Sequence, residues 1–292
     1  MVRKKPNERT HLISSTTRFG LRIDVDTIRG LTEGVPQALD ILNEMGIHAT
    51  FFITTGPDRS GRNLFHIHQR ETSLLKRNPL RRYGLKQILY GLLLPAPLME
   101  TQRDIIEEIM RKGHEVGLHG YDHYRWANYF HKMSDEEISS CLRKGVHILT
   151  RILGKRPTGF ASPSFKWSPS SLMVQSRLDF IYSSDMHGNT VFYPQVGTKT
   201  LKTLQIPVSQ PLIEELVLAG MSDSKIVDFL SKGFQTKNFV TIYIHAGYEC
   251  IFKKNLLRAI VSEVLRFEHV NTFKFIELAV ELGKFARIRI IP

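Results

Sequence analysis

The chain contains few cysteines: Cys141 and Cys250 are the only two among its 292 residues. Two cysteines far apart in ordinary segments cannot form the disulfide framework that stabilises small secreted domains. We therefore expect both to be free, buried thiols in a protein of a reducing compartment.

Long apolar runs are also missing from the chain. No stretch approaches the roughly 18 apolar residues that a transmembrane helix needs. Residues 1–8 are basic, but no apolar segment follows them, so they make a poor secretory signal. We see no internal repeat and no low-complexity linker. With 42% apolar residues, the composition predicts a globular protein with a large core.

Acidic residues are outnumbered, because 40 lysines and arginines face 28 aspartates and glutamates, which gives a net charge of +12. The excess is concentrated in residues 59–103, which contain nine basic and two acidic side chains. Such a patch favours a polyanion, an acidic lipid surface or a phosphorylated substrate. Nucleic acid is disfavoured, because no recognisable reader motif is present.

Strand-like apolar runs alternate with helical patterns, and this alternation predicts a mainly parallel α/β sheet, either open or closed into a barrel. We expect one catalytic domain at 18–285, between a basic tail at 1–17 and a tail at 286–292. The predicted strands are 19–25, 47–53, 115–118, 159–162, 180–183, 204–208, 239–244 and 272–275. The predicted helices are 34–45, 104–112, 134–153, 222–235, 254–267 and 277–282. A capping box at 134–137 opens the third of these, and glycines at 46, 113, 154 and 283 follow where helices are expected to end.

Four polar residues follow two of these strands. Asp24 and Asp26 end the first strand and share one of its faces. His119 follows the third strand, and His123 comes four residues later, a spacing that places two imidazoles on one face of a helical turn. Two histidines and one aspartate leave a position open on a metal ion, as in catalytic sites. The second aspartate could then act as a base, so the pattern predicts a metal-dependent hydrolase. The alternatives are a strand-end turn and ordinary surface or core histidines.

Two further polar residues, Asp185 and His245, also follow predicted strands. Active sites of parallel α/β barrels are built at these carboxyl ends. His245 is a candidate general acid, and Asp185 could orient it and hold it protonated. A hydrogen-bonded core histidine and a turn-capping aspartate are the alternatives.

Residues 57–103 interrupt the strand–helix rhythm and form a predicted insertion after the second strand. Within it, residues 85–94 are strongly apolar and are flanked by Arg81, Arg82 and Pro95. A basic, aromatic and apolar stretch too short to span a membrane is typical of an interfacial segment. The alternative for the basic residues is an ordinary solvated face.

The order Asp-x-Asp, Ala-Thr-Phe-Phe at 49–52, His-x-x-x-His and a late Ile-His resembles the NodB-type polysaccharide deacetylases. The resemblance covers roughly residues 19–282 and implies a deformed (β/α) barrel in a single domain. It also implies the following roles: Asp26, His119 and His123 as metal ligands, Asp24 as base and His245 as acid.

One motif departs from that family, which usually has an Arg-x-Pro-Tyr segment whose arginine holds the base. Residues 160–165 here read Phe-Ala-Ser-Pro-Ser-Phe, and the Lys166 that follows is not equivalent to arginine. The branch that deformylates undecaprenyl-phosphate formamido-arabinose also lacks the arginine and carries an insertion after the second strand. Similarity to that branch rests on residues 22–27, 56–62, 115–119, 182–185, 205–208 and 241–246.

This branch implies a lipid-linked phosphosugar substrate and a cytoplasmic enzyme peripheral to the anionic inner face of the membrane. The residues expected to contact substrate are Arg59, Arg62, Arg81, Arg82, Lys166 and Glu249. The ligand set suits zinc, but also cobalt, manganese, nickel or iron. Formyl and acetyl differ by one methyl group, worth only ~1–3 kcal/mol in a pocket. The alternatives are a deacetylase of a soluble or cell-wall saccharide and a non-catalytic basic module that binds membrane or nucleic acid. The oligomeric state is left open.

Overall fold

A sheet of parallel strands lies at the centre of the computed structural model, which describes residues 16–63 and 88–291. Neighbouring strands pair in parallel in the order β9-β1-β2-β3-β4-β5-β8, and β10 (Val270–Phe273) pairs with the first half of β1. The bounds are β1 (Thr17–Val25), β2 (Thr50–Ile53), β3 (Glu115–Leu118), β4 (Gly159–Phe160), β5 (Tyr182–Ser183), β8 (Leu204–Gln205) and β9 (Phe239–His245).

The sheet curves towards a barrel but does not close through strand pairing. In the described part of the chain, no ladder joins β8 to β9. The loop after β8 instead reaches β9 through Ser209, whose Oγ accepts a 2.9 Å hydrogen bond from the Thr241 amide. The Thr241 hydroxyl donates to the carbonyl of Pro207 at 2.7 Å. The prediction of a deformed α/β barrel is therefore confirmed.

Three strands that were not predicted extend the sheet, and one of them, β11, lies beyond the predicted domain. β6 (Phe192–Val196) runs antiparallel to β7 (Lys199–Thr200) and to β8, and β11 (Arg287–Ile291) pairs in parallel with β6. Residues 286–292 were predicted to be a tail outside the domain, and Gly283 was predicted to end the last helix. Gly283 instead has φ −59° and begins a short 3₁₀ turn, η7 (Gly283–Phe285), that leads into β11.

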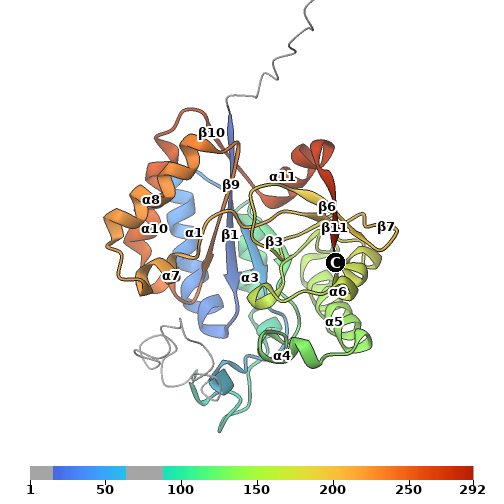
Figure 1. The fold of residues 1–292 in the computed structure, drawn as a ribbon. Coiled ribbons are helices and arrows are strands. Elements are labelled where there is room, and N and C mark those ends of the chain that lie inside the picture. Colours follow the sequence, from blue (N-terminus) through green and yellow to red (C-terminus); the bar gives the residue numbers. More distant parts are fainter. Residues whose placement is uncertain (1–15, 64–87, 292) are drawn as a thin grey trace, which may run out of the picture.

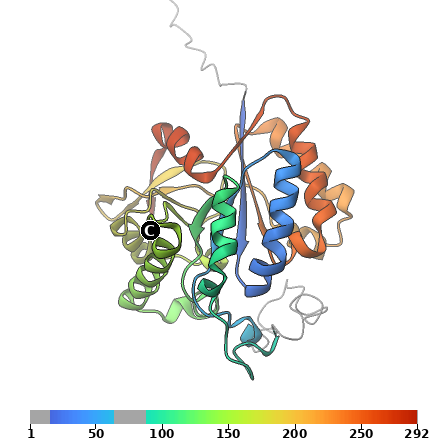
Figure 2. The ribbon, with the colours of Figure 1, turned by 180° about the vertical axis from the view of Figure 1, so that it is seen from behind.

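Helices cover both flanks of the sheet. Figure 1 shows α1, α8 and α10 on one flank and α5 and α6 on the other. Seen from behind, α1 and α3 stand side by side across the sheet (Figure 2). The bounds are α1 (Val35–Met45), which follows the π-helix η1 (Gly30–Gly34), α3 (Arg103–Arg111), α4 (His123–Tyr129), α5 (Asp135–Leu153), α6 (Pro169–Arg177), α7 (Ile213–Leu218), α8 (Asp223–Thr236), α9 (Glu249–Phe252), α10 (Lys254–Leu265) and α11 (Phe275–Leu282). Shorter 3₁₀ turns are η4 (Met99–Gln102), η5 (Phe130–Lys132) and η6 (Pro163–Phe165).

Local sequence signals set several helix ends as predicted. Ser134 and Glu137 form a reciprocal capping box at the start of α5. Gly46 and Gly154 end α1 and α5 in the left-handed conformation, with φ of 65° and 68°. Both free cysteines are buried, as expected.

Residues 88–102 pack directly on the loop after β2. Met99 donates to the Gly56 carbonyl at 3.2 Å, and Asp58 donates through its amide to the Pro97 carbonyl at 2.9 Å. The turn that precedes these contacts exposes Leu93 to 81% and Leu94 to 43%. This part of the insertion lies at the end of the molecule to which β1 points, beside α4 (Figure 1). No helix within the described residues is long and apolar enough to cross a membrane.

Candidate active site

The carboxyl ends of β1, β3 and β9 bring the predicted residues together. Parallel pairing of β1 with β9 sets Asp24 opposite His245, and pairing through β2 places His119, directly after β3, on the same edge. Asp26 follows β1 by one residue. Strand ends meet in this way because the chain reverses through a helix after each parallel strand. The predicted placement at strand carboxyl ends is confirmed.

Asp26, His119 and His123 converge on one point, as predicted. One potential ligand atom from each lies within 4.8 Å of the other two. Asp26 Oδ1 is 3.2 Å from His119 Nε2 and 3.5 Å from His123 Nε2. The two imidazole centroids are 5.3 Å apart.

The two histidines meet through a strand-to-helix turn and not through one helical turn. His119 follows β3, whereas His123 is the first residue of α4. Gly120 has φ +77°, a backbone conformation that L side chains rarely adopt, and this lets the chain turn sharply. Asp122 caps α4 by accepting a 3.0 Å hydrogen bond from the Arg125 amide. The expected helical i, i+4 arrangement was therefore wrong, although the proximity was right.

The chemistry of this cluster fits a divalent cation. His119 Nδ1 lies 2.8 Å from the Ala161 carbonyl, which can only accept, so Nδ1 carries a proton and Nε2 is the nitrogen that faces Asp26. Asp26 Oδ1 is buried and has no hydrogen-bond partner among the described residues. Burial opposes ionisation of Asp26, but the imidazoles of His123, His119 and His245 hold its pKa well below the usual range. When Nε2 carries no proton, its lone pair lies beside the Asp26 carboxylate oxygen, and the two are complementary to a cation between them.

Asp24 is held by an arginine on its own strand. Arg22 Nε donates to Asp24 Oδ1 and Arg22 Nη2 donates to Asp24 Oδ2, both at 2.7 Å. The arginine side chain is fully buried, and that of Asp24 is only 4% exposed. Burial opposes the charge on Arg22, but Asp24 raises the pKa of the guanidinium above its ordinary value. Asp24 Oδ2 lies 3.7 Å from His119 Nε2, beside the candidate metal ligands.

Aromatic rings surround the buried guanidinium. The Arg22 guanidinium carbon is 5.3, 4.9 and 5.6 Å from the ring centroids of Phe52, Phe165 and Tyr243. Phe165 belongs to the turn that replaces the arginine-containing segment of the family. Ser164 and Phe165 both have positive φ, 54° and 53°, which is uncommon for non-glycine residues.

His245 faces the metal-ligand cluster on one side and two buried carboxylates on the other. Its Nε2 is 3.8 Å from Asp26 Oδ2, and its Nδ1 is 3.8 Å from Glu214 Oε2 and 3.9 Å from Glu249 Oε2. Glu249 also accepts a 2.8 Å hydrogen bond from the His245 amide and a 3.2 Å bond from the Glu214 amide.

Asp185 does not orient His245, which corrects one prediction. Its carboxylate accepts hydrogen bonds from the Ser162 amide at 2.9 Å and from Gln205 Nε2 at 3.2 Å. Within the described ranges, the acidic partners of His245 are those named above. Burial raises the pKa of Asp185. The strand-end position was right, but the side chain holds the turn after β4 instead.

The residues expected to contact substrate occupy different environments. Arg59 is 35% exposed and pairs with Asp122, the cap of α4, while Arg62 Nε donates to the Gly91 carbonyl at 2.7 Å. Lys166 is exposed next to the Phe165 turn. Glu249 is fully buried beneath His245, a position that suits holding the histidine rather than contacting a substrate. The other two, Arg81 and Arg82, lie outside the described residues.

Three site residues had no assigned role in the sequence analysis: Arg22, Glu214 and Asp58. Asp58 accepts hydrogen bonds from the amides of Ile28 at 2.7 Å and Ser60 at 2.9 Å, which ties the segment after Asp26 to the loop after β2. Arg22 carried a detectable signal, since it is a charge inside an apolar strand on the same face as Asp24. Glu214 and Asp58 carried none.

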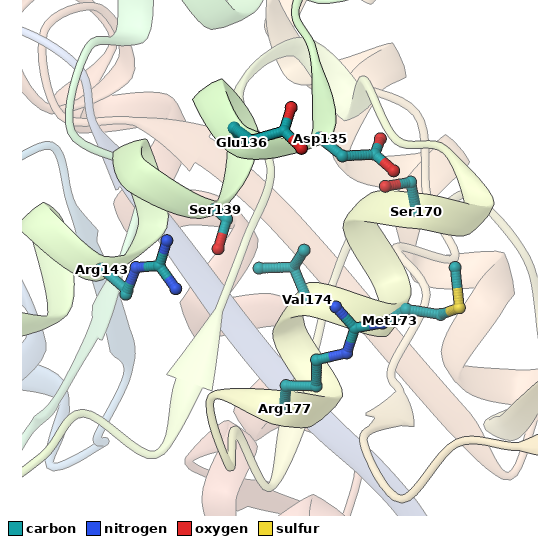
Figure 3. A pocket seen from close by; sticks show the side chains of 8 residues that line it. All are labelled: Asp135, Glu136, Ser139, Arg143, Ser170, Met173, Val174 and Arg177. Atoms are coloured by element: carbon teal, nitrogen blue, oxygen red, sulfur yellow. The ribbon is translucent and has the colours of Figure 1, made fainter.

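A separate groove lies between α5 and α6 (Figure 3). Arg143 and Arg177 line it together with Asp135 and Glu136, so it carries charges of both signs. All of its lining residues belong to these two helices, neither of which supplies a strand-end group. The groove is therefore distinct from the candidate active site.

Comparison with known proteins agrees with this geometry. The family model "polysaccharide deacetylase" matches residues 21–183. The chain is 35% identical over 206 residues to the probable 4-deoxy-4-formamido-L-arabinose-phosphoundecaprenol deformylase of Shewanella sediminis, a match that covers 70% of this chain and 66% of that relative. It is 30% identical over 246 residues to the protein of the same name in Wigglesworthia glossinidia brevipalpis, across 82% of this chain and 86% of the relative.

A solved structure supports the fold. A Mycobacterium smegmatis protein described as a polysaccharide deacetylase superimposes with a TM-score of 0.68 at 16% identity, over 99% of this chain and 96% of that one. With the family-model match and the two relatives, this shows that the chain belongs to the polysaccharide deacetylase family and is a hydrolase of amide bonds.

Proposed function

We propose that this protein is a metal-dependent amide hydrolase that removes an N-formyl group from an amino sugar linked to a lipid phosphate. The observation that carries the proposal is the convergence of Asp26, His119 and His123 beside Asp24 and His245. A divalent ion held by the first three residues would act as a Lewis acid and lower the pKa of a water molecule.

The two remaining residues divide the proton transfers. Asp24 is the base: Arg22 fixes its carboxylate, and its Oδ2 faces the ligand cluster at 3.7 Å from His119 Nε2. His245 is the acid that delivers a proton to the departing amine nitrogen. Its Nε2 reaches the same space from the neighbouring strand β9, and Glu214 and Glu249 lie next to its Nδ1. An amine is a poor leaving group until it is protonated, so amide cleavage depends on this acid.

The substrate class is supported by the surface next to the site. Arg59 pairs with Asp122, the residue directly before His123. Arg62 lies on the same loop as Arg59, after β2. The exposed Leu93 turn packs against that loop, so positive and apolar groups stand together beside the candidate active site. A phosphate next to an acyl chain is complementary to such a surface. We accordingly propose peripheral association with the anionic, cytoplasmic face of the membrane.

Product analysis tests the activity. Purified protein is stripped with a chelator, reloaded with zinc, cobalt, manganese, nickel or iron(II), and incubated with an undecaprenyl-phosphate formamido-sugar or its acetamido counterpart. Mass spectrometry should record metal-dependent loss of the acyl group. Failure of every ion to restore hydrolysis of either lipid would contradict the proposal.

The second candidate function is deacetylation of a soluble or cell-wall saccharide, which the name of the matched family model favours. An N-acetylated oligosaccharide assayed in parallel separates the two. Charge reversal at Arg77, Arg81 and Arg82 provides a further contrast. It should weaken salt-sensitive binding to anionic vesicles but leave hydrolysis of a small soluble amide nearly intact. A parent protein that ignores vesicles and cleaves the oligosaccharide supports the second candidate.

A further inference from the structure

A base works only when its carboxylate oxygen points at the proton it removes, so something must fix the rotation of Asp24. We propose that Arg22 is the positioning residue that sets the orientation of the Asp24 carboxylate, in place of an arginine contributed from another strand end. The effect of this orientation on catalysis rests on the proposed function. The orientation of the Asp24 carboxylate itself can be measured separately from activity.

The fork geometry of the pair supports this role. Nε and Nη2 of Arg22 each donate to one oxygen of Asp24 at 2.7 Å, so the pair is bidentate and rotation of the carboxylate breaks both bonds. A lysine ammonium could bond one oxygen well but could not define the plane. The paired orientation leaves Oδ2 facing His119 Nε2 at 3.7 Å.

The Arg22 side chain is itself held in place by Ser184. Its Nη1 donates to the Ser184 carbonyl at 2.5 Å and lies 3.1 Å from the Ser184 hydroxyl. With the side chain fully buried, the guanidinium has no solvent-exposed alternative position. All three nitrogens of Arg22 are therefore engaged, two with Asp24 and one with the end of β5.

The unusual backbone at Ser164 and Phe165 has an explanation in this arrangement. Two consecutive non-glycine residues with positive φ are strained, and such strain persists where the surroundings enforce it. Here the turn delivers the Phe165 ring to 4.9 Å from the guanidinium carbon, while Tyr243 and Phe52 supply the other rings. Position 161, where the family's arginine would stand, is a fully buried alanine whose carbonyl serves His119.

The first test is kinetic and uses Arg22→Ala, Arg22→Lys and a matched control, Arg18→Ala. Arg18 is also on β1 and also pairs with a carboxylate, that of Glu281, but at the far end of the strand. Both Arg22 variants should lose about 10²–10⁴-fold in kcat with KM changed less than about threefold, because only proton transfer is misaligned. Arg18→Ala should match the parent.

The second test is chemical rescue. Guanidinium added to Arg22→Ala should restore part of kcat, whereas methylammonium should not, because only the former offers two parallel N–H groups. Metal affinity, measured by titration calorimetry with zinc, should stay within about tenfold of the parent. Loss of metal binding in parallel with kcat, or absence of any rescue, would assign Arg22 to the fold alone and overturn the inference.

Crystal structures of zinc-loaded parent and Arg22→Lys separate this inference from the proposed function. The Asp24 carboxylate should be rotated or split between orientations in the variant. If the parent hydrolyses no amide, the proposed function fails, while the carboxylate orientation still decides the role of Arg22. An unchanged, single orientation in Arg22→Lys overturns the inference whatever the activity. Arg22→Lys retains the buried positive charge, so it remains usable if Arg22→Ala does not fold.

Discussion

Replacement of His245 by alanine should distinguish amide from ester hydrolysis. His245 Nε2 lies 3.8 Å from Asp26 Oδ2, so the imidazole borders the space in which the acyl group would react. A positioned general acid contributes about 10²–10⁴-fold to a rate. At about 1.36 kcal/mol for each tenfold, His245→Ala should raise the barrier to amide cleavage by about 3–5 kcal/mol. A formate ester of the same sugar has a better leaving group and should lose less than about tenfold.

The assay compares kcat/KM on the two substrates for the parent and the variant. A matched control is His187→Ala, because the His187 ring lies 6.2 Å from that of Tyr243 but forms no ion pair with Asp26 among the described residues. That control should change both substrates equally. Glu249→Gln keeps the imidazole and removes one carboxylate behind it, so its selective loss on the amide should be smaller. Equal losses on amide and ester for His245→Ala would refute the role of acid.

Four further outcomes follow from the structure. Asp24→Asn should keep zinc binding in calorimetry and lose turnover by several orders of magnitude, whereas Asp26→Asn should lose both; equal metal loss would make both residues ligands. Glu115→Ala should lower the free energy of unfolding in urea by roughly 2–6 kcal/mol, since it removes the acceptor of four hydrogen bonds, two of them from fully buried hydroxyls; a change below about 1 kcal/mol would contradict this. Burial, with neighbouring cations, lowers the pKa of His114 from 6.5 to about 4, so the unfolded chain binds the proton first and stability should fall by up to about 3 kcal/mol as pH drops from 6.5 to 4; His114→Gln should flatten that dependence in denaturation curves. Leu93→Asp should weaken binding to anionic vesicles in high salt, where the apolar contact dominates, and unchanged sedimentation with vesicles would remove this turn from the membrane surface.

Local signals in the sequence determined much of the fold. Alternation of apolar strands with amphipathic helices specified a parallel α/β sheet, because each pattern is a property of neighbouring residues. The capping box at Ser134 and the glycine after Met45 appear where predicted, since caps satisfy backbone groups within one turn. Strands β6 and β11 were not predicted, because β6 contains a proline and β11 is exposed at all but its last residue.

The identity of the central site residues could also be read from the sequence. Asp24, Asp26, His119 and His245 each follow an apolar run, and carboxyl ends of parallel strands meet at one edge. The backbone conformation that brings His119 close to His123 could not be read from the sequence. A left-handed glycine followed by a new helix places the two side chains nearly as close as one helical turn would.

Only the tertiary structure decided which side chains lie against Asp24 and His245, the proposed base and acid. Asp185 was the strand-end carboxylate visible in the sequence, yet Glu214 and Glu249 lie behind His245. The arginine that holds Asp24 comes from two residues earlier on β1 and not from the segment at 160–165. Sequence periodicity fixes the face on which a side chain lies, but a contact between groups far apart in the chain depends on strand register and on the burial that excludes competing water.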